Sequence, residues 1–226
     1  MLDTLASGFE NPLQRYIIKG LIFVEMAFHK KIKSLDEVLR LYGVRYEEMG
    51  LALLTSFKMP EAVKEDLAFV LDKLDYKSTE GAIREYVISP ILKEAWKRYA
   101  DDFLLWVEKA ISYKKEFVGV PDYIISRRSA MGKIFFESPH VAVVEAKKDD
   151  FVGGWTQCAL EMYAIQKIND TDLSAVYGIV TNGDTWEIGA LENSVFTKYT
   201  DVFILKNIDE LYNALCTIFE KCALPK

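Results

Sequence analysis

The spacing of apolar residues changes along this 226-residue chain, from a helical period to an extended one near Lys115. Between residues 10 and 76 apolar positions recur at intervals of three and four, which is typical of amphipathic helices. We expect about four helices there. Ser34 and Pro60 stand where helix N-termini begin. The expected turns lie near Lys33, Gly43 and Met59.

The rest of the chain predicts helices followed by strands. Helices are expected at 80–99, with a bend at Pro90, and at 101–111. Four extended runs follow, and two more helices are expected among and after them. The strands are expected at 117–126, 141–147, 175–181 and 185–191, and the helices at 154–168 and 208–222. Asn182-Gly183-Asp184 predicts a tight hairpin turn between the last two strands.

This order of elements predicts an α/β (α+β) fold, with a mixed central sheet flanked by helices. The change of pattern near residue 77 divides the chain into an all-helical N-terminal region, 1–77, and a second domain, 78–226. Half of the residues are hydrophobic, which is enough for a full core. No apolar run reaches the roughly 20 residues of a membrane helix, and the N-terminus lacks a secretory signal, so we expect a cytoplasmic protein.

Composition excludes some classes of site. The three cysteines, Cys158, Cys216 and Cys222, form no C-x-x-C pair, and the chain has two histidines, so neither a disulfide framework nor a zinc site is expected. The 28 basic and 34 acidic residues give a formal net charge of −6. This charge has the wrong sign for a protein that wraps nucleic acid without specificity.

The most informative stretch is the apolar run 141–144, which ends in Glu145-Ala146-Lys147. Residues two apart in a strand share a face, so Glu145 and Lys147 should project together from its end. Asp122 opens another apolar run after Pro121. If the two strands pair as neighbours, two carboxylates and an ammonium group meet, a combination that suits a hard divalent cation such as Mg²⁺.

Pro121-Asp122 and Glu145-Ala146-Lys147 resemble the signature of the PD-(D/E)xK nucleases, the restriction-endonuclease-like superfamily. The resemblance covers roughly residues 78–191. The order helix, strand, strand, strand, helix, strand is similar to the core of that family, if one short extra strand lies between Glu116 and Ser138. The helix around 79–92 looks like the corresponding helix in type I restriction motor subunits and their stand-alone relatives.

The resemblance implies a phosphodiester hydrolase with a Mg²⁺ or Mn²⁺ cofactor. Asp122, Glu145 and the backbone carbonyl of Ala146 would hold the metal, and Lys147 would orient or deprotonate the attacking water. Glu80, with Glu85 as the second choice, would complete the metal shell or act through a water.

The family also places a glutamine early in the helix after the E-x-K strand, which Gln157 fits. The usual tyrosine four residues later is absent. Position 161 is Glu161, and Tyr163 comes two residues further on. The role of Gln157 therefore stays open.

Each of these residues also has a structural interpretation. Glu145 and Lys147 could form a solvated ion pair, Asp122 could be a turn residue, and Glu80 could simply stabilise a helix N-terminus. Three functions follow. The first is a metal-dependent nuclease that acts on nucleic acid, with DNA as the expected substrate. The second is a catalytically inactive binding or scaffold protein, and the third is a purely structural one. The N-terminal helices could serve a homodimer or a partner protein.

Overall fold

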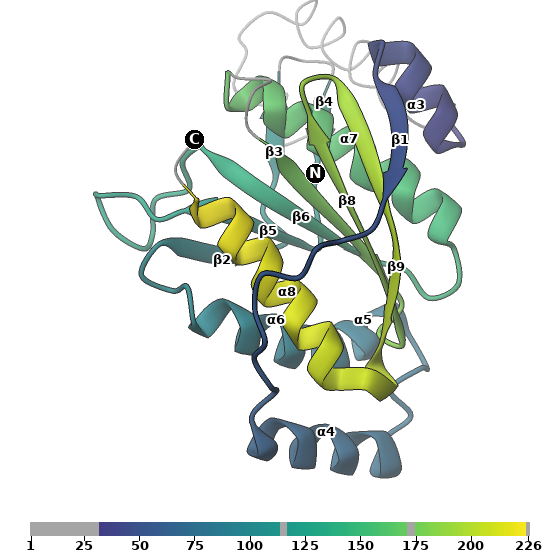
Figure 1. The fold of residues 1–226 in the computed structure, drawn as a ribbon, viewed down its shortest axis with the longest axis vertical. Coiled ribbons are helices and arrows are strands. Elements are labelled where there is room, and N and C mark those ends of the chain that lie inside the picture. The colour runs from purple at the N-terminus through teal and green to yellow at the C-terminus, as the bar shows by residue number, and fades with distance from the viewer. Residues whose placement is uncertain (1–31, 114–116, 171–174, 225–226) are drawn as a thin grey trace, which may run out of the picture.

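The computed structural model describes residues 32–113, 117–170 and 175–224 (Figure 1). A seven-stranded mixed sheet runs through the molecule in the order β1-β9-β8-β7-β6-β5-β2. Only the pairs β1·β9 and β6·β7 are parallel. In that order the strands are Arg45–Met49, Val195–Ile204, Thr185–Glu192, Val176–Thr181, His140–Ala146, Tyr123–Arg127 and Phe103–Val107.

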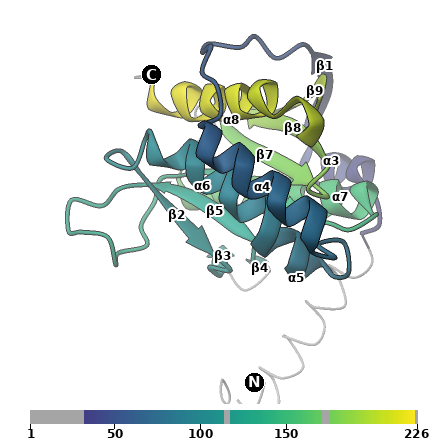
Figure 2. The ribbon, with the colours of Figure 1, turned by 90° about the horizontal axis from the view of Figure 1, so that it is seen from below.

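Helices cover both faces of this sheet, as Figure 2 shows. One face packs against α4 (Glu61–Lys73), α5 (Glu80–Ile83), α6 (Ser89–Lys97) and α8 (Ile208–Ala223). The other packs against α3 (Leu35–Tyr42) and α7 (Phe151–Ile168). Every residue of β6 is buried, as expected for a strand covered on both faces. The mixed sheet flanked by helices is confirmed.

The helix expected at 80–99 is present but is not a continuous α-helix. Thr79 caps its start, since its Oγ1 accepts a hydrogen bond from the Ala82 N–H at 3.0 Å. A π-helical turn, η1 (Arg84–Ile88), then separates α5 from α6, and Pro90 lies in the first turn of α6. Pro90 has no N–H to donate to the preceding turn, and the wider turn just before it accommodates that loss.

The prediction of a helix at 101–111 is wrong, because residues 103–107 form strand β2. The strand expected at 117–126 is two strands, β4 (Phe117–Gly119) and β5. The resemblance required an extra core strand between residues 116 and 138, and β4 does not supply it, because it pairs with β3 (Ile111–Tyr113) in a separate two-stranded sheet. β2 therefore supplies the third strand beside β5 and β6.

The all-helical N-terminal region is also wrong for the described residues, because β1 lies in it. The turn at Gly43 is confirmed by its left-handed φ of 64°, and the helix after Pro60 is confirmed as α4. The expected helical stretch 10–31 lies outside the described residues. Since β1 joins the main sheet at β9, residues 45–49 belong to the same sheet as the second segment, and the division at residue 77 stays a prediction.

The segment between β1 and α4 has no regular secondary structure and is held by side chains of α8. The backbone N–H groups of Phe57 and Met59 donate to Asn213 Oδ1 and Asp209 Oδ1, each at 2.9 Å. These side-chain oxygens accept the backbone hydrogen bonds that a neighbouring strand would otherwise accept.

The turn at Asn182-Gly183-Asp184 joins β7 to β8 as expected. Gly183 has a φ of +85°, which glycine adopts without steric cost. Strand β9 was not expected. It follows a second tight turn, Asn193-Ser194, in which both residues have positive φ.

Among the described residues, no helix has both the length and the apolar character that a bilayer crossing requires.

Helix α7 approaches the ends of β6 and β7 closely at Gly154. A Cβ atom there would lie 2.7 Å from Val180 Cγ1 and 3.0 Å from Lys147 Cγ. We predict that Gly154→Ala lowers the free energy of unfolding by about 1–3 kcal/mol, because the helix must move away from the sheet. Urea denaturation measures this change.

Gly81→Ala is the matched control. It lies in the first turn of α5, where an added Cβ would meet only Thr79 Oγ1 at 3.7 Å. Its free energy of unfolding should stay unchanged or rise by up to about 1 kcal/mol, since alanine favours a helix over glycine. An equal loss of unfolding free energy in the two variants would contradict the close approach of α7 to the sheet.

Candidate functional site

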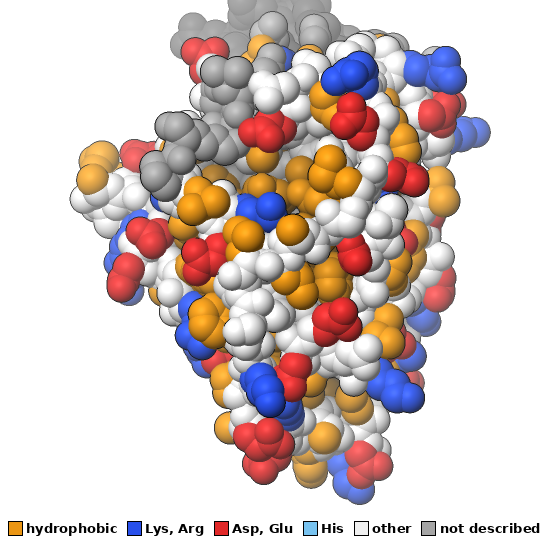
Figure 3. Space-filling model, viewed as in Figure 1, with side chains coloured by type: hydrophobic (Ala, Val, Ile, Leu, Met, Phe, Trp, Pro, Cys, Tyr) orange, Lys and Arg blue, Asp and Glu red, His pale blue; other side chains and the backbone are white. Residues whose placement is uncertain are grey.

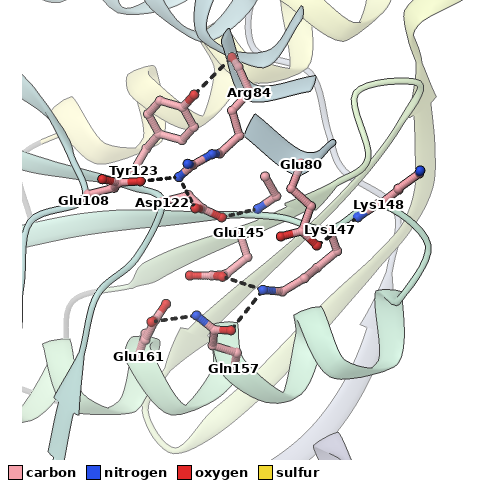
Figure 4. Close-up of polar contacts among 11 residues, drawn as sticks. Glu80, Arg84, Glu108, Asp122, Tyr123, Glu145, Lys147, Lys148, Gln157 and Glu161 are labelled. Carbon is pink, nitrogen blue, oxygen red and sulfur yellow. Dashed lines mark hydrogen bonds and ion pairs between the residues drawn. The ribbon is translucent and has the colours of Figure 1, made fainter. Parts of the chain in front are cut away.

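Asp122, Glu145 and Lys147 meet at the adjoining ends of β5 and β6 (Figure 4). The strands pair with Tyr123 opposite Val144, so Asp122 lies just before β5, beside the end of β6. Its Oδ2 accepts a hydrogen bond from the Ala146 N–H at 2.8 Å. The aspartate thus binds the backbone of the E-x-K motif directly, which is more than a turn residue would do.

Arg84 holds the other oxygen of Asp122. Its Nη1 donates to Asp122 Oδ1 at 2.6 Å and to Glu108 Oε1 at 2.7 Å. The backbone carbonyl of Arg84 accepts a hydrogen bond from the Tyr123 hydroxyl at 3.2 Å. The helix that begins at Glu80 is therefore tied to the start of β5 by both a side chain and its backbone.

Glu145 is a buried carboxylate. Its residue is 0% exposed, and neither oxygen has a hydrogen-bond partner among the described residues. Lys147 Nζ forms an ion pair with Glu145 Oε2 at 3.5 Å. Burial raises the pKa of Glu145 to about 7. The interaction with the Glu161 side chain and the charge of Lys147 oppose that rise, and the charge of Asp122 adds to it. This burial excludes the solvated ion pair as an interpretation of Glu145 and Lys147.

Two side chains of α7 continue the network from Lys147. Lys147 Nζ donates to Gln157 Oε1 at 3.1 Å, and Gln157 Nε2 donates to Glu161 Oε1 at 3.3 Å. Gln157 and Glu161 are four residues apart and so share one face of the helix. The glutamine orients the lysine.

Glu161 is buried as deeply as Glu145. It is 2% exposed, and its Oε2 has no hydrogen-bond partner among the described residues. Burial, followed by the charge of Glu145, raises the pKa of Glu161 well above its ordinary value. The two buried carboxyl groups therefore influence each other.

Glu80 lies at the edge of this group. Its Oε1 accepts a hydrogen bond from the Lys148 N–H at 3.4 Å, so the helix start does reach the end of β6 (Figure 4). Within the described residues, no hydrogen bond joins Glu80 to Asp122, Glu145 or Lys147. Glu85, the second choice, is an exposed residue of η1.

Sequence reasoning did not assign Arg84, Glu108 or Glu161 to the site. A signal existed for two of them. Arg84 follows Glu80 by four residues, and Glu161 follows Gln157 by four, so each lies one helical turn from a candidate residue. Glu108 carries no comparable signal, because it follows a strand that was expected to be a helix.

The donor atoms near β6 suit a hard cation only in part. Across the described ranges, no group of three or more His, Cys, Asp or Glu side chains is close enough to form a ready metal site. The two unpartnered oxygens of Glu145 do fit such an ion. Asp122 is already hydrogen-bonded on both oxygens, although each carboxylate oxygen has a second lone pair. In a regular strand the carbonyl and the N–H of one residue lie on the same side, so strand geometry places the Ala146 carbonyl on the side of Asp122.

A surface hollow lies elsewhere. It is lined by Ala110, Ile111, Phe136, His140 and Ile168, among others. His140 is the first residue of β6, whereas Glu145 is near its last. The hollow is therefore separate from the residues described above.

The buried carboxyl groups predict that stability depends on pH. Because burial raises the pKa of both Glu145 and Glu161 above 4.5, the folded protein retains protons that the unfolded chain releases. The free energy of unfolding of the metal-free protein should therefore fall as pH rises from about 5 to about 8. Glu161→Gln should reduce this fall and raise stability at about pH 8 by about 1–3 kcal/mol.

Urea denaturation with a chelator, at both pH values, measures this effect. Glu187→Gln is a control, because Glu187 already accepts hydrogen bonds from Trp155 Nε1 and from Lys198 Nζ, at 2.5 and 2.6 Å. The control should not gain stability at high pH. If the stability of Glu161→Gln depends on pH as that of the wild type does, the two carboxyl groups do not retain extra protons in the folded protein.

Comparison of the chain with protein-family models, with curated proteins and with solved structures finds no match.

Proposed function

We propose that this chain is a metal-dependent nuclease that hydrolyses phosphodiester bonds of nucleic acid in the cytoplasm, with DNA as the expected substrate. The observation that carries the proposal is the meeting of Asp122, Glu145 and Lys147 at adjoining strand ends, with Asp122 bound to the backbone of Ala146. Two carboxylates and an ammonium group on one side of a sheet suit phosphodiester hydrolysis with a divalent cation.

The order of elements supports the same proposal. A helix, Glu80 to Lys97, precedes the antiparallel strands β2, β5 and β6, and α7 then leads to β7, parallel to β6. This order resembles the core of the PD-(D/E)xK nucleases, on which the assignment of site residues rests. Fold resemblance alone does not establish activity, so the proposal depends on the site.

In this proposal Asp122, Glu145 and the carbonyl of Ala146 hold Mg²⁺ or Mn²⁺, which supplies positive charge to the phosphate. Lys147 orients the attacking water and balances the charge that develops on the phosphate oxygens. Gln157 keeps the ammonium group in place through its hydrogen bond. Glu80 lies beside the strand end, where it can act through a water molecule.

The net charge of −6 argues against a nucleic-acid surface that covers the whole protein. Basic and acidic side chains are interspersed on the face covered by α8 (Figure 3). The candidate site is on the α7 side of the sheet. We therefore place nucleic acid on the α7 side rather than around the whole protein. Dimer formation or partner binding through the N-terminal region remains a proposal.

An inactive scaffold is the second candidate. The ion pair between Arg84 and Asp122 favours it, because the guanidinium group satisfies Asp122 without a metal. In the nuclease, Arg84 instead holds Asp122 in place and leaves its second lone pairs for the ion. Substitutions at Lys147 and Glu145 separate the two functions.

Lys147→Ala should lower Mg²⁺- or Mn²⁺-dependent cleavage by about 10²-fold or more, because the water and the developing charge lose their cationic partner. Because the Lys147 side chain is only 20% exposed and pairs with Glu145, circular dichroism must show that the variant is folded. Cleavage of single-stranded, duplex and branched DNA and of RNA measures turnover, and calorimetry measures metal affinity, which should be kept. Lys73→Ala, in an exposed ion pair on α4, should change neither.

Glu145→Gln should weaken both metal binding and turnover, because it removes the negative charge that attracts the ion. The contrast with Lys147→Ala tests the assigned roles rather than general sensitivity to mutation. If the wild-type protein cleaves none of these substrates and binds no metal in calorimetry, the scaffold replaces the nuclease.

A further inference from the structure

Glu161 is a buried residue of the site that the proposed mechanism does not use. It projects from α7 toward β6, and Glu145 projects from β6 toward α7 (Figure 4). Figure 4 shows the two carboxyl groups next to each other, and each influences the ionisation of the other. Three of their four oxygens have no hydrogen-bond partner: Glu145 Oε1, Glu145 Oε2 and Glu161 Oε2.

The surrounding cations neutralise this pair only in part. Lys147 Nζ forms an ion pair with Glu145 Oε2 at 3.5 Å and also donates a hydrogen bond to Gln157 Oε1, so it balances at most one of the two negative charges. Arg84 is occupied by Asp122 and Glu108. Two adjacent buried carboxylates therefore share one nearby ammonium group, and like charges so placed require a further positive partner or a proton.

Gly119 in β4 lies beside the Glu161 carboxyl group and has no side chain that would occupy the space. A Cβ atom on Gly119 would lie 3.1 Å from Glu161 Oε1, so the absence of a side chain in β4 makes space for the carboxyl group. Gly119, Lys147 and Gln157 are each partly exposed. The pair thus lies just below the surface, within reach of an ion from solvent.

We propose that Glu145 and Glu161 bind a divalent cation of the Mg²⁺ or Mn²⁺ class between them, on the α7 side of Glu145. This position differs from the one between Asp122 and the Ala146 carbonyl. Oxygen-only donors select a hard cation. Gln157 positions Glu161 through the hydrogen bond to its Oε1, which leaves Oε2 for the ion.

The cation site does not depend on catalysis. If the chain is a nuclease, which is the proposed function, Glu145 would contact two cations, and the α7 position would be the second of a two-ion arrangement. If the chain is a scaffold, the same pair would bind a single structural ion. Cation binding without nucleic acid therefore tests this inference separately from activity.

The experiment is Mn²⁺ binding to the full chain, measured by calorimetry and by the electron paramagnetic resonance of free Mn²⁺. Glu161→Gln should remove one bound ion or weaken its affinity by about tenfold or more, a loss that even an indirect partner of a metal ligand can produce. Asp122→Asn should leave this ion bound, because Asp122 is not one of its ligands. Glu187→Gln, whose carboxylate is already paired with Lys198, should bind Mn²⁺ like the wild type.

Loss of stability does not obscure the result, because removing a buried unpartnered charge is expected to stabilise the fold, and circular dichroism checks each variant. Wild-type Mn²⁺ affinity and stoichiometry in Glu161→Gln would overturn the inference and indicate that the pair shares a proton. Absence of any Mn²⁺ binding to the wild type at millimolar concentration would overturn it as well.

The outcomes for the two proposals are distinguishable. If Mn²⁺ binding depends on Glu161 but the protein cleaves no nucleic acid, the proposed cation site is supported and the proposed nuclease function is wrong. If cleavage depends on Lys147 but Mn²⁺ binding does not depend on Glu161, the nuclease function is supported and the proposed cation site is wrong.

Discussion

The carboxylate of Glu145 at the end of the fully buried strand β6 is the constraint on which the arrangement of the site depends. A buried charge without hydrogen bonds is unfavourable unless a proton, an ammonium group or a metal ion compensates it. Lys147 is the compensating group nearest to Glu145, at 3.5 Å, and Gln157 fixes that lysine from α7. The close approach of α7 at Gly154 keeps this support in reach of the strand.

Local sequence patterns predict the central strands and the main helices, but they do not predict the edge strands β1 and β2 of the sheet. The runs that became β6, β7 and β8 are apolar and bounded by turn residues, and α7 and α8 carry long helical patterns. The sequence of β2, FLLWV, is apolar throughout and suits either a helix or a strand, so its pairing with β5 decides the outcome. β1 is exposed at every residue, and it is a strand only because it pairs with β9, 150 residues away at Arg45 and Val195.

The site shows the same division between local and distant information. Glu145 and Lys147 share a face because of the strand period, and Asp122 reaches them because two neighbouring strands pair. Arg84 and Glu161 lie one helical turn from Glu80 and Gln157, but only the packing of η1 and α7 against the sheet brings them to the strand ends. Motif letters therefore found the carboxylates, but the partners that set their electrostatics required the tertiary structure.

The energetics of the buried pair favour a functional role over a purely structural one. A chain that needed this fold only as a scaffold would be more stable with amide or apolar side chains at positions 145 and 161, because both carboxyl groups are buried and incompletely hydrogen-bonded. Groups that reduce stability are concentrated where binding or catalysis requires them. Of the described carboxylates, Glu145 and Glu161 combine burial with unpartnered oxygens, and both lie next to Lys147 and Gln157. Their cost to the metal-free fold is the physical reason for proposing a cation there.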